Sequence, residues 1–143
     1  MASVRLAPSF RAQVHAVVQS IPAGRVMTYG QIAGLIPPPP GSDLHTWEQV
    51  KARWVGYAMA SCPDELPWQR VVNSRGRISV RGGEGPDLQR LLLADEGVVF
   101  EEAGQIDLAR YRWEPEPEWH AAHPEYLPPS SGPASPGKTG RRS

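Results

Sequence analysis

The sequence predicts a single, mostly helical α/β domain that contains a helix-turn-helix and a small β-hairpin. Apolar residues recur at helical spacing in several stretches, whereas the adjacent valines Val71 and Val72 give residues 69–73 the character of a strand. The chain has 143 residues, of which 40% are hydrophobic. That composition is sufficient for one core, and the length does not call for a second domain.

The first predicted helix carries an apolar stripe made of Phe10, Val14, Val17, Val18 and Ile21. These residues share one helical face, so we expect a core helix that ends before Pro22. Residues 22–24, Pro-Ala-Gly, predict a turn, and Val26 and Met27 predict a short extended segment after it.

A second, short helix is predicted from Tyr29. Thr28 and Gln31 have the spacing of a capping box, and the prolines at positions 37–40 end the helix. Ser42 or Asp43 can cap a third helix, whose best supported part is residues 52–61. A kink or break before Lys51 stays open. A short capped helix, a turn and a longer helix form the pattern of a helix-turn-helix, although ordinary helical pairs share it.

The later part of the chain predicts short strands, one more helix and a tail. Residues 69–73 have strand character, residues 74–76 read as a turn and residues 77–80 as a return strand, which together make a hairpin. Leucines after Pro86 predict a helix that Gly97 stops, and residues 98–100 and 111–113 add extended pieces. We expect a domain of residues 1–113 and a Pro-, Ser- and Gly-rich tail of residues 114–143, largely disordered, above all in its last fifteen residues.

The charges are segregated although the formal net charge is zero. Residues 51–81 contain six basic and two acidic residues, and residues 84–107 contain seven acidic residues and one basic residue. One face can therefore be cationic, with ordinary solvated surfaces as the alternative. The single cysteine, Cys62, excludes an internal disulfide and a multi-cysteine metal site. No secretion leader or long apolar run is found, so we expect a cytoplasmic protein that does not enter a membrane.

Four stretches carry a resemblance to a known family: IPAGRVMTYGQIA (residues 21–33), ARWVGYAM (52–59), PWQRVVNSRGRIS (67–79) and LLLADEGV (91–98). In this order the chain, from about Phe10 to Val98, resembles the C-terminal DNA-binding domain of the O6-alkylguanine-DNA alkyltransferases. The resemblance implies a winged-helix-like DNA-binding fold. Trp68 replaces the alkyl-accepting cysteine and Gln69 the neighbouring histidine, which is similar to the alkyltransferase-like proteins. These bind alkylated guanine without repairing it and pass the lesion to nucleotide excision repair.

The chemistry of the motif agrees with that loss of activity. Alkyl transfer needs an activated thiolate, and an indole offers neither a nucleophilic lone pair nor a titratable proton. An indole does offer a flat apolar wall for an alkyl group or a base. We therefore expect no catalytic residue, no metal and no cofactor.

The resemblance implies a first set of residues that bind DNA and flip the nucleotide. Arg53 matches an arginine that enters the base stack in place of the flipped nucleotide, and Tyr29 a tyrosine that presses on the phosphate 3′ to it. Ala52 and Gly56 are small enough for the helix to lie close to the minor groove. Thr28 is better explained as a helix cap, although it can also contact a phosphate. For Arg53 and Tyr29, the alternative is an ordinary surface or half-buried side chain.

A second set is implied for the lesion pocket. Trp68 is its wall, and Arg81 places a cation over the flipped purine. Gln69 and Val71 belong to the same motif, and Arg70 has a structural or phosphate-facing role. A further member, Glu96, supports these residues by hydrogen bonds.

The chain also departs from the family. Cys62 stands in place of a hinge asparagine, Trp54 in place of a small residue, and residues 36–50 form a longer linker between the two helices. The expected partners are double-stranded DNA containing O6-alkylguanine and nucleotide excision repair proteins, bound by a monomer. A helix-turn-helix transcription regulator that reads undamaged DNA, and an alkyltransferase that uses Cys62, are the alternatives. The preferred adduct, the repair partner and the roles of the linker and tail stay open.

Overall fold

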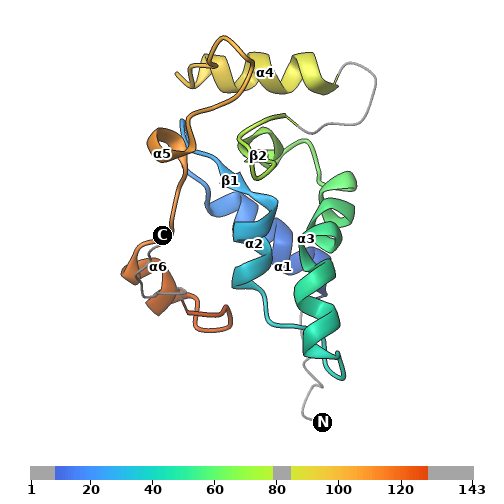
Figure 1. Ribbon diagram of the computed structural model, residues 1–143. Helices are drawn as coiled ribbons and strands as arrows, with labels where there is room; N and C mark the ends of the chain where they lie inside the picture. The colour runs from blue at the N-terminus through green and yellow to red at the C-terminus, as the bar shows by residue number, and fades with distance from the viewer. Residues whose placement is uncertain (1–8, 79–84, 129–143) are drawn as a thin grey trace.

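The computed structural model describes residues 9–78 and 85–128 (Figure 1). Arg81 and the end of the predicted hairpin lie outside these residues. The elements, in chain order, are α1 (Phe10–Ser20), β1 (Met27–Thr28), α2 (Tyr29–Leu35), α3 (Leu44–Ala60), the 3-10 helix η1 (Trp68–Arg70), β2 (Val71–Val72), α4 (Gly85–Asp95), α5 (Leu108–Tyr111) and α6 (Pro117–Ala122).

Helices α1, α2 and α3 pack together around the larger of two core clusters. The predicted stripe of α1 is confirmed, because Val14, Val17 and Val18 are fully buried. The capping box of α2 is also confirmed. Gln31 donates its backbone N–H to the Thr28 hydroxyl (3.0 Å), and Thr28 donates its own N–H to the Gln31 side chain (2.9 Å). This fixes where α2 begins.

Helix α3 runs without interruption from Leu44 to Ala60, so the possible break before Lys51 is wrong. Asp43 caps it, accepting a hydrogen bond from the Thr46 backbone N–H (3.0 Å). Buried Trp47 anchors the first turns of the helix against α1. Residues 44–50, which the sequence assigns to a linker, are therefore helical, and only residues 36–43 connect α2 to α3.

The small sheet is parallel and is not the predicted hairpin. β1 and β2 pair in the register Met27 with Val71 and Thr28 with Val72. All four residues are buried, which suits a parallel pair that is covered on both faces. Arg77 and Ile78 are not in a strand. The Arg77 carbonyl instead accepts a hydrogen bond from the Asn73 N–H (3.0 Å) and closes a turn after β2.

Helix α4 lies beyond the small sheet, at the end of the molecule away from the start of α3 (Figure 1). A second core cluster joins it to the strands and to the following loop, and consists of Val26, Val72, Leu93, Val98, Ile106 and Tyr111. Part of the predicted extended segment at residues 111–113 is helical, because Tyr111 ends α5. Beyond it, Trp113 donates its N–H to the Val26 carbonyl (2.7 Å), so the chain returns alongside β1.

The packed part of the chain extends past Trp113, where the sequence predicts the domain to end. Trp113 and Tyr126 are buried in the larger core cluster, and Trp119 of α6 packs against it. Tyr126 donates its hydroxyl to the Gln13 carbonyl (3.2 Å), and Leu127 donates its N–H to the Leu35 carbonyl (2.7 Å). Residues 114–128 therefore cover α1 and α2, and the rest of the predicted tail lies outside the described residues.

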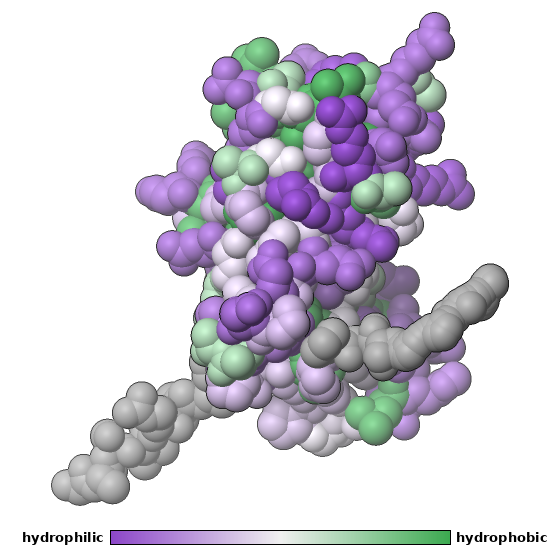
Figure 2. All heavy atoms as spheres, turned by 90° about the vertical axis from the view of Figure 1, so that its left-hand side faces the viewer, coloured by the Kyte–Doolittle hydropathy of each residue, from purple (hydrophilic) through white to green (hydrophobic). Residues whose placement is uncertain are grey.

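The face on the side of α5 and α6 is mixed in character. Figure 2 shows hydrophilic residues interspersed with several separate hydrophobic areas on the described part of this face. Across residues 9–78 and 85–128, no helix combines the length and apolar character needed to cross a membrane.

Candidate nucleic-acid interface

A groove of about 570 Å³ lies between the start of α2, the second half of α3 and the turn after β2. We call it the α2/α3 groove; its lining residues are Tyr29, Gly30, Ala52, Arg53, Gly56, Tyr57, Ala60, Asn73 and Ser74. Most of the first predicted set meets here, since Tyr29 comes from α2 and Ala52, Arg53 and Gly56 come from α3. None of the lining residues is acidic. The groove therefore offers an anionic ligand no repulsion from its own walls.

Arg53 is the cation of this groove. Its side chain is exposed on α3 and makes no hydrogen bond or ion pair with any other described residue. Two residues earlier on the same helix, Lys51 behaves differently, because its ammonium pairs with Glu48 at 2.9 Å. The Arg53 guanidinium is therefore available to a ligand, and its planar shape allows stacking and hydrogen bonding together.

Thr28 lies beneath the groove and does not line it. It is buried, and its hydroxyl accepts the Gln31 N–H within the capping box. Gln31 in turn donates its side-chain amide to the Trp113 carbonyl (2.9 Å). These contacts hold the start of α2, and with it Tyr29, against the returning C-terminal segment. They favour the cap role that the sequence indicates for Thr28.

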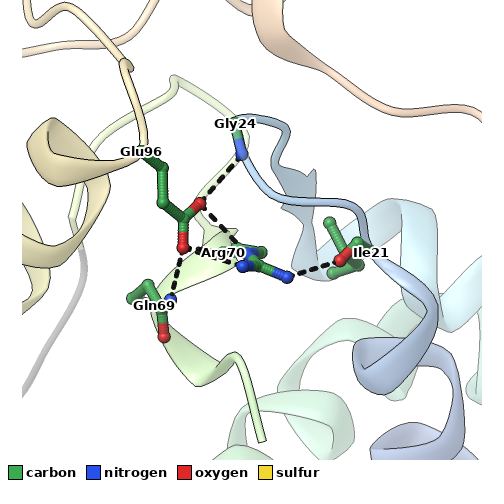
Figure 3. Close-up of polar contacts among 5 residues, drawn as sticks. All are labelled: Ile21, Gly24, Gln69, Arg70 and Glu96. Carbon is green, nitrogen blue, oxygen red and sulfur yellow. Dashed lines mark hydrogen bonds and ion pairs between the residues drawn. The ribbon is translucent and has the colours of Figure 1, made fainter.

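Three residues of the second predicted set form one polar network centred on the Glu96 carboxylate (Figure 3). Arg70 donates to both carboxylate oxygens with N–O distances of 2.9–3.1 Å, and Gln69 donates its amide to one of them (2.7 Å). The Gly24 N–H donates to the other (2.9 Å), and Arg70 also donates to the Ile21 carbonyl (2.7 Å). Glu96 thus joins three segments that are far apart in the sequence.

The network sets the protonation state of Glu96. Burial by itself raises the pKa of this carboxyl group. Hydrogen bonds from Arg70, the Gly24 N–H and Gln69, together with the positive charge of Arg70, outweigh burial and hold the pKa below its ordinary value of 4.5. The carboxylate is therefore charged at neutral pH, and its charge is matched by Arg70.

The remaining predicted pocket residues lie apart from the groove. Trp68 is half-buried at the start of η1 and is not among the residues that line the α2/α3 groove. Val71 is buried in the core and pairs with Met27, so it supports the motif from inside. Arg81 lies outside the described residues. The lesion pocket formed by Trp68 and Arg81 accordingly stays a prediction.

Gln89 is a member of this site that the sequence did not reveal. Its side chain is 1% exposed and donates to the carbonyls of Gln69 and Val71, both at 3.0 Å. These carbonyls lie on either side of Arg70, so α4 holds the motif through Gln89 as well as through the loop that carries Glu96. The available signal was a glutamine four residues before Leu93, on the buried face of the predicted helix.

Replacing Gln89 with leucine should lower the free energy of unfolding by roughly 1–3 kcal/mol, because two buried carbonyl groups lose their donors. Thermal or urea unfolding followed by circular dichroism measures this change. The control is Gln19→Leu on the exposed surface of α1, which should stay within about 0.5 kcal/mol of the unmodified protein. Equal stability of the two variants would contradict a supporting role for Gln89.

Two further observations restrict the chemistry of the site. Cys62 follows α3, and burial, with a smaller effect from the negative charge of Asp64, raises the pKa of its thiol to about 11. The thiol is therefore protonated at neutral pH and is a poor nucleophile. Within the described part of the chain, no group of three or more His, Cys, Asp or Glu side chains is arranged to hold a metal ion.

Comparisons with known proteins agree on the region that contains this site. The model of the family "6-O-methylguanine DNA methyltransferase, DNA binding domain" matches residues 9–98. The DNA base-flipping protein of Escherichia coli (strain K12) is 46% identical over 110 residues, which cover 73% of this chain and 74% of that protein. Alkyltransferase-like protein 1 of Schizosaccharomyces pombe is 36% identical over 113 residues, which cover 74% and 95%.

A solved structure has a similar fold. The crystal structure of S. pombe Atl1 in complex with damaged DNA containing O6-carboxymethylguanine matches with a TM-score of 0.57 at 36% sequence identity. The match covers 74% of this chain and 95% of that one.

Proposed function

The chain belongs to the alkyltransferase-like branch of the 6-O-methylguanine DNA methyltransferase family, and from this membership we propose that it is a non-enzymatic sensor of O6-alkylguanine in duplex DNA. Its relatives include a DNA base-flipping protein and a protein crystallised with damaged DNA. The protein binds the duplex, turns the damaged nucleotide out of the stack and holds it.

The observation that carries this proposal is the α2/α3 groove, whose described lining is free of acidic residues and which presents the Arg53 guanidinium without an ion pair to any described residue. Ala52 and Gly56 keep the wall of α3 low, so a minor groove can approach the helix. Flipping a nucleotide costs a few kcal/mol of stacking and pairing. Arg53 offsets part of this cost by occupying the vacated place, and Tyr29 acts on the phosphate next to it.

The flipped base is received at Trp68, where an apolar ring can pack against an alkyl group. No thiolate is available there, so the lesion is bound and not consumed. Arg81 contributes a cation to the same pocket. The bound lesion is then passed to nucleotide excision repair, with the protein acting as a monomer in the cytoplasm on chromosomal DNA.

The test is a mobility-shift titration with two duplexes that differ only in one O6-alkyl group on a central guanine. We expect tighter binding of the alkylated duplex, with an affinity that falls as the salt concentration rises, because phosphate contacts release counterions. Equal affinity for both duplexes would overturn the proposal. Preference for one particular undamaged sequence would instead indicate a transcription regulator.

A second measurement separates binding from alkyl transfer. Incubation with DNA that carries a radiolabelled O6-methylguanine should leave no label on the protein, because the raised pKa of Cys62 keeps its thiol protonated. Cys62→Ala should bind the alkylated duplex with unchanged affinity. Label on the unmodified protein that is absent from Cys62→Ala would show that the chain is an alkyltransferase.

A further inference from the structure

A second hollow, of about 480 Å³, adjoins the α2/α3 groove. It lies between the start of α1 and α3 and is lined by Ser9, Phe10, Arg11, Trp54, Tyr57 and Ala58. Tyr57 lines both hollows, so they form one continuous surface. We call the part formed by Phe10, Arg11, Trp54 and Tyr57 the aromatic surface.

The aromatic surface exposes large rings to water. Tyr57 is 65% exposed and Trp54 is 46% exposed. Trp54 is nevertheless held in place, because it makes edge contacts with Phe10 and with buried Trp47, each at 6.0 Å between ring centroids. An exposed ring that is fixed from behind, as Trp54 is, is suited to stacking, since little side-chain entropy is lost when a ligand binds.

The charge of the aromatic surface favours a polyanion. None of the described residues that line the two hollows is acidic, although the chain as a whole has equal numbers of acidic and basic residues. Arg11 lines one hollow and Arg53 lines the other, and neither forms an ion pair with a described residue. Flat rings together with two guanidinium groups that pair with no described residue have the composition of a surface that binds single-stranded nucleic acid.

We propose that the aromatic surface binds unpaired bases of a DNA strand that continues beyond the duplex held in the α2/α3 groove. This inference builds on the proposed function and adds a second kind of ligand to it. Unpaired bases fit better than a further length of duplex, because a duplex hides its base faces within the stack and offers aromatic rings only backbone and groove edges. The sensor then recognises lesions beside single-stranded DNA better than lesions in continuous duplex.

The experiment compares an alkylated duplex that has blunt ends with the same duplex carrying a short oligothymidine extension. The extension is placed at either the 5′ end or the 3′ end of one strand. The unmodified protein should bind one extended form at least about fivefold more tightly, since stacking one base on an aromatic ring contributes that much. Trp54→Leu, which keeps an apolar contact with Trp47 but removes the ring, should lose this gain and keep its affinity for the blunt duplex.

Arg11→Ala supplies a second variant that does not depend on core packing, because Arg11 is exposed on α1. It should also lose most of the gain. The matched control is Arg110→Ala on α5, which removes an exposed arginine outside both hollows and should keep the gain in full. Survival of the gain in both Trp54→Leu and Arg11→Ala would overturn the inference.

Other outcomes would reject the inference without rejecting the proposed function. Absence of any gain from the extension, together with intact preference for the alkylated duplex, would reject the inference and leave the proposed function standing. If the protein shows no preference for the alkylated duplex, the same extension on an undamaged duplex still tests whether the aromatic surface binds unpaired bases. A dimer seen by sedimentation that disappears in Trp54→Leu would show that a second copy of the chain covers the surface, which also rejects the inference.

Discussion

Replacing Arg53 with alanine is expected to weaken binding of the alkylated duplex by about 1–3 kcal/mol, roughly 5- to 150-fold in dissociation constant. The guanidinium is the one side chain that we propose to occupy the place of the flipped nucleotide, and alanine cannot fill that space. Binding of the undamaged duplex should weaken less, because it loses only one charge contact. Mobility-shift or fluorescence-anisotropy titrations with both duplexes measure the difference.

Two controls separate stacking from charge. Arg53→Lys keeps the charge but not the planar group, so it should recover affinity for the undamaged duplex and only part of the affinity for the alkylated one. Arg110→Ala removes one positive charge away from the groove and should change both affinities equally and slightly. If Arg53→Ala weakened both duplexes to the same extent, Arg53 would be a phosphate contact and not the residue that fills the gap.

Glu96→Gln is expected to give the largest loss of stability, about 2–4 kcal/mol. The substitution keeps the shape of the side chain but removes the charge that balances Arg70, whose side chain is only 17% exposed. It also replaces one carboxylate oxygen with an NH₂ group, which then faces Arg70 together with either the Gln69 amide or the Gly24 N–H, all of them donors. This loss of stability is smaller than that for breaking a fully buried ion pair, because the side chains of Arg70 and Glu96 both retain some contact with solvent.

Chemical unfolding with urea measures this loss, and Glu114→Gln is the matched control. Glu114 pairs with Arg112 at 3.1 Å, but these side chains are 69% and 44% exposed. Breaking an exposed pair should cost no more than about 1 kcal/mol. A loss for Glu96→Gln as small as that of the control would show that the network around Glu96 contributes little to folding.

The same network has a consequence for the dependence of stability on pH. The pKa of Glu96 is lower in the folded protein than its ordinary value of 4.5. Its contribution to stability is therefore complete above pH 4.5 and is lost as the pH falls through the folded value. In Glu96→Gln this part of the acid sensitivity should disappear, so the difference between the two proteins narrows in acid.

Local sequence patterns predicted the helices. Contacts between residues far apart in the sequence explain where the structure differs from the prediction. The stripe of α1 and the capping box of α2 depend on residues a few positions apart, so they can be recognised in the sequence. The partner of Val71 and Val72 is β1, more than forty residues earlier, and nothing near β2 indicates that pairing. A neighbouring turn suggested a hairpin instead.

Residues 114–128 were predicted to belong to a disordered tail but are packed, and the physical reason is a different one. The prolines and polar residues of this segment are typical of a disordered tail. An average over its composition does not show that a few large aromatic side chains can bury enough area to hold it in place. Trp119 and Tyr126 pack on the larger core cluster and supply the buried area that holds residues 114–128 in place.

Residues that line the candidate groove could be predicted from the sequence. Residues that support other residues through hydrogen bonds were harder to predict. Arg53 and Tyr29 were identified from their motifs, and the structure brings them to one groove. Gln69 and Arg70 were assigned to the pocket with Glu96 as their hydrogen-bonding support, and both donate to its carboxylate. Gln89 was missed because its role depends on which backbone carbonyls α4 reaches, and this is known only once the helix is placed.

The attachment of the motif to α4 bears on how lesion preference can be engineered. Glu96 and Gln89 hold residues 69–71, and Leu93 on the buried face of α4 holds the segment that follows residues 79–84. The described segments on either side of residues 79–84 therefore have contacts of their own. We expect that libraries varied only at residues 79–84, Arg81 included, will yield sensors with altered adduct selectivity on an unchanged scaffold.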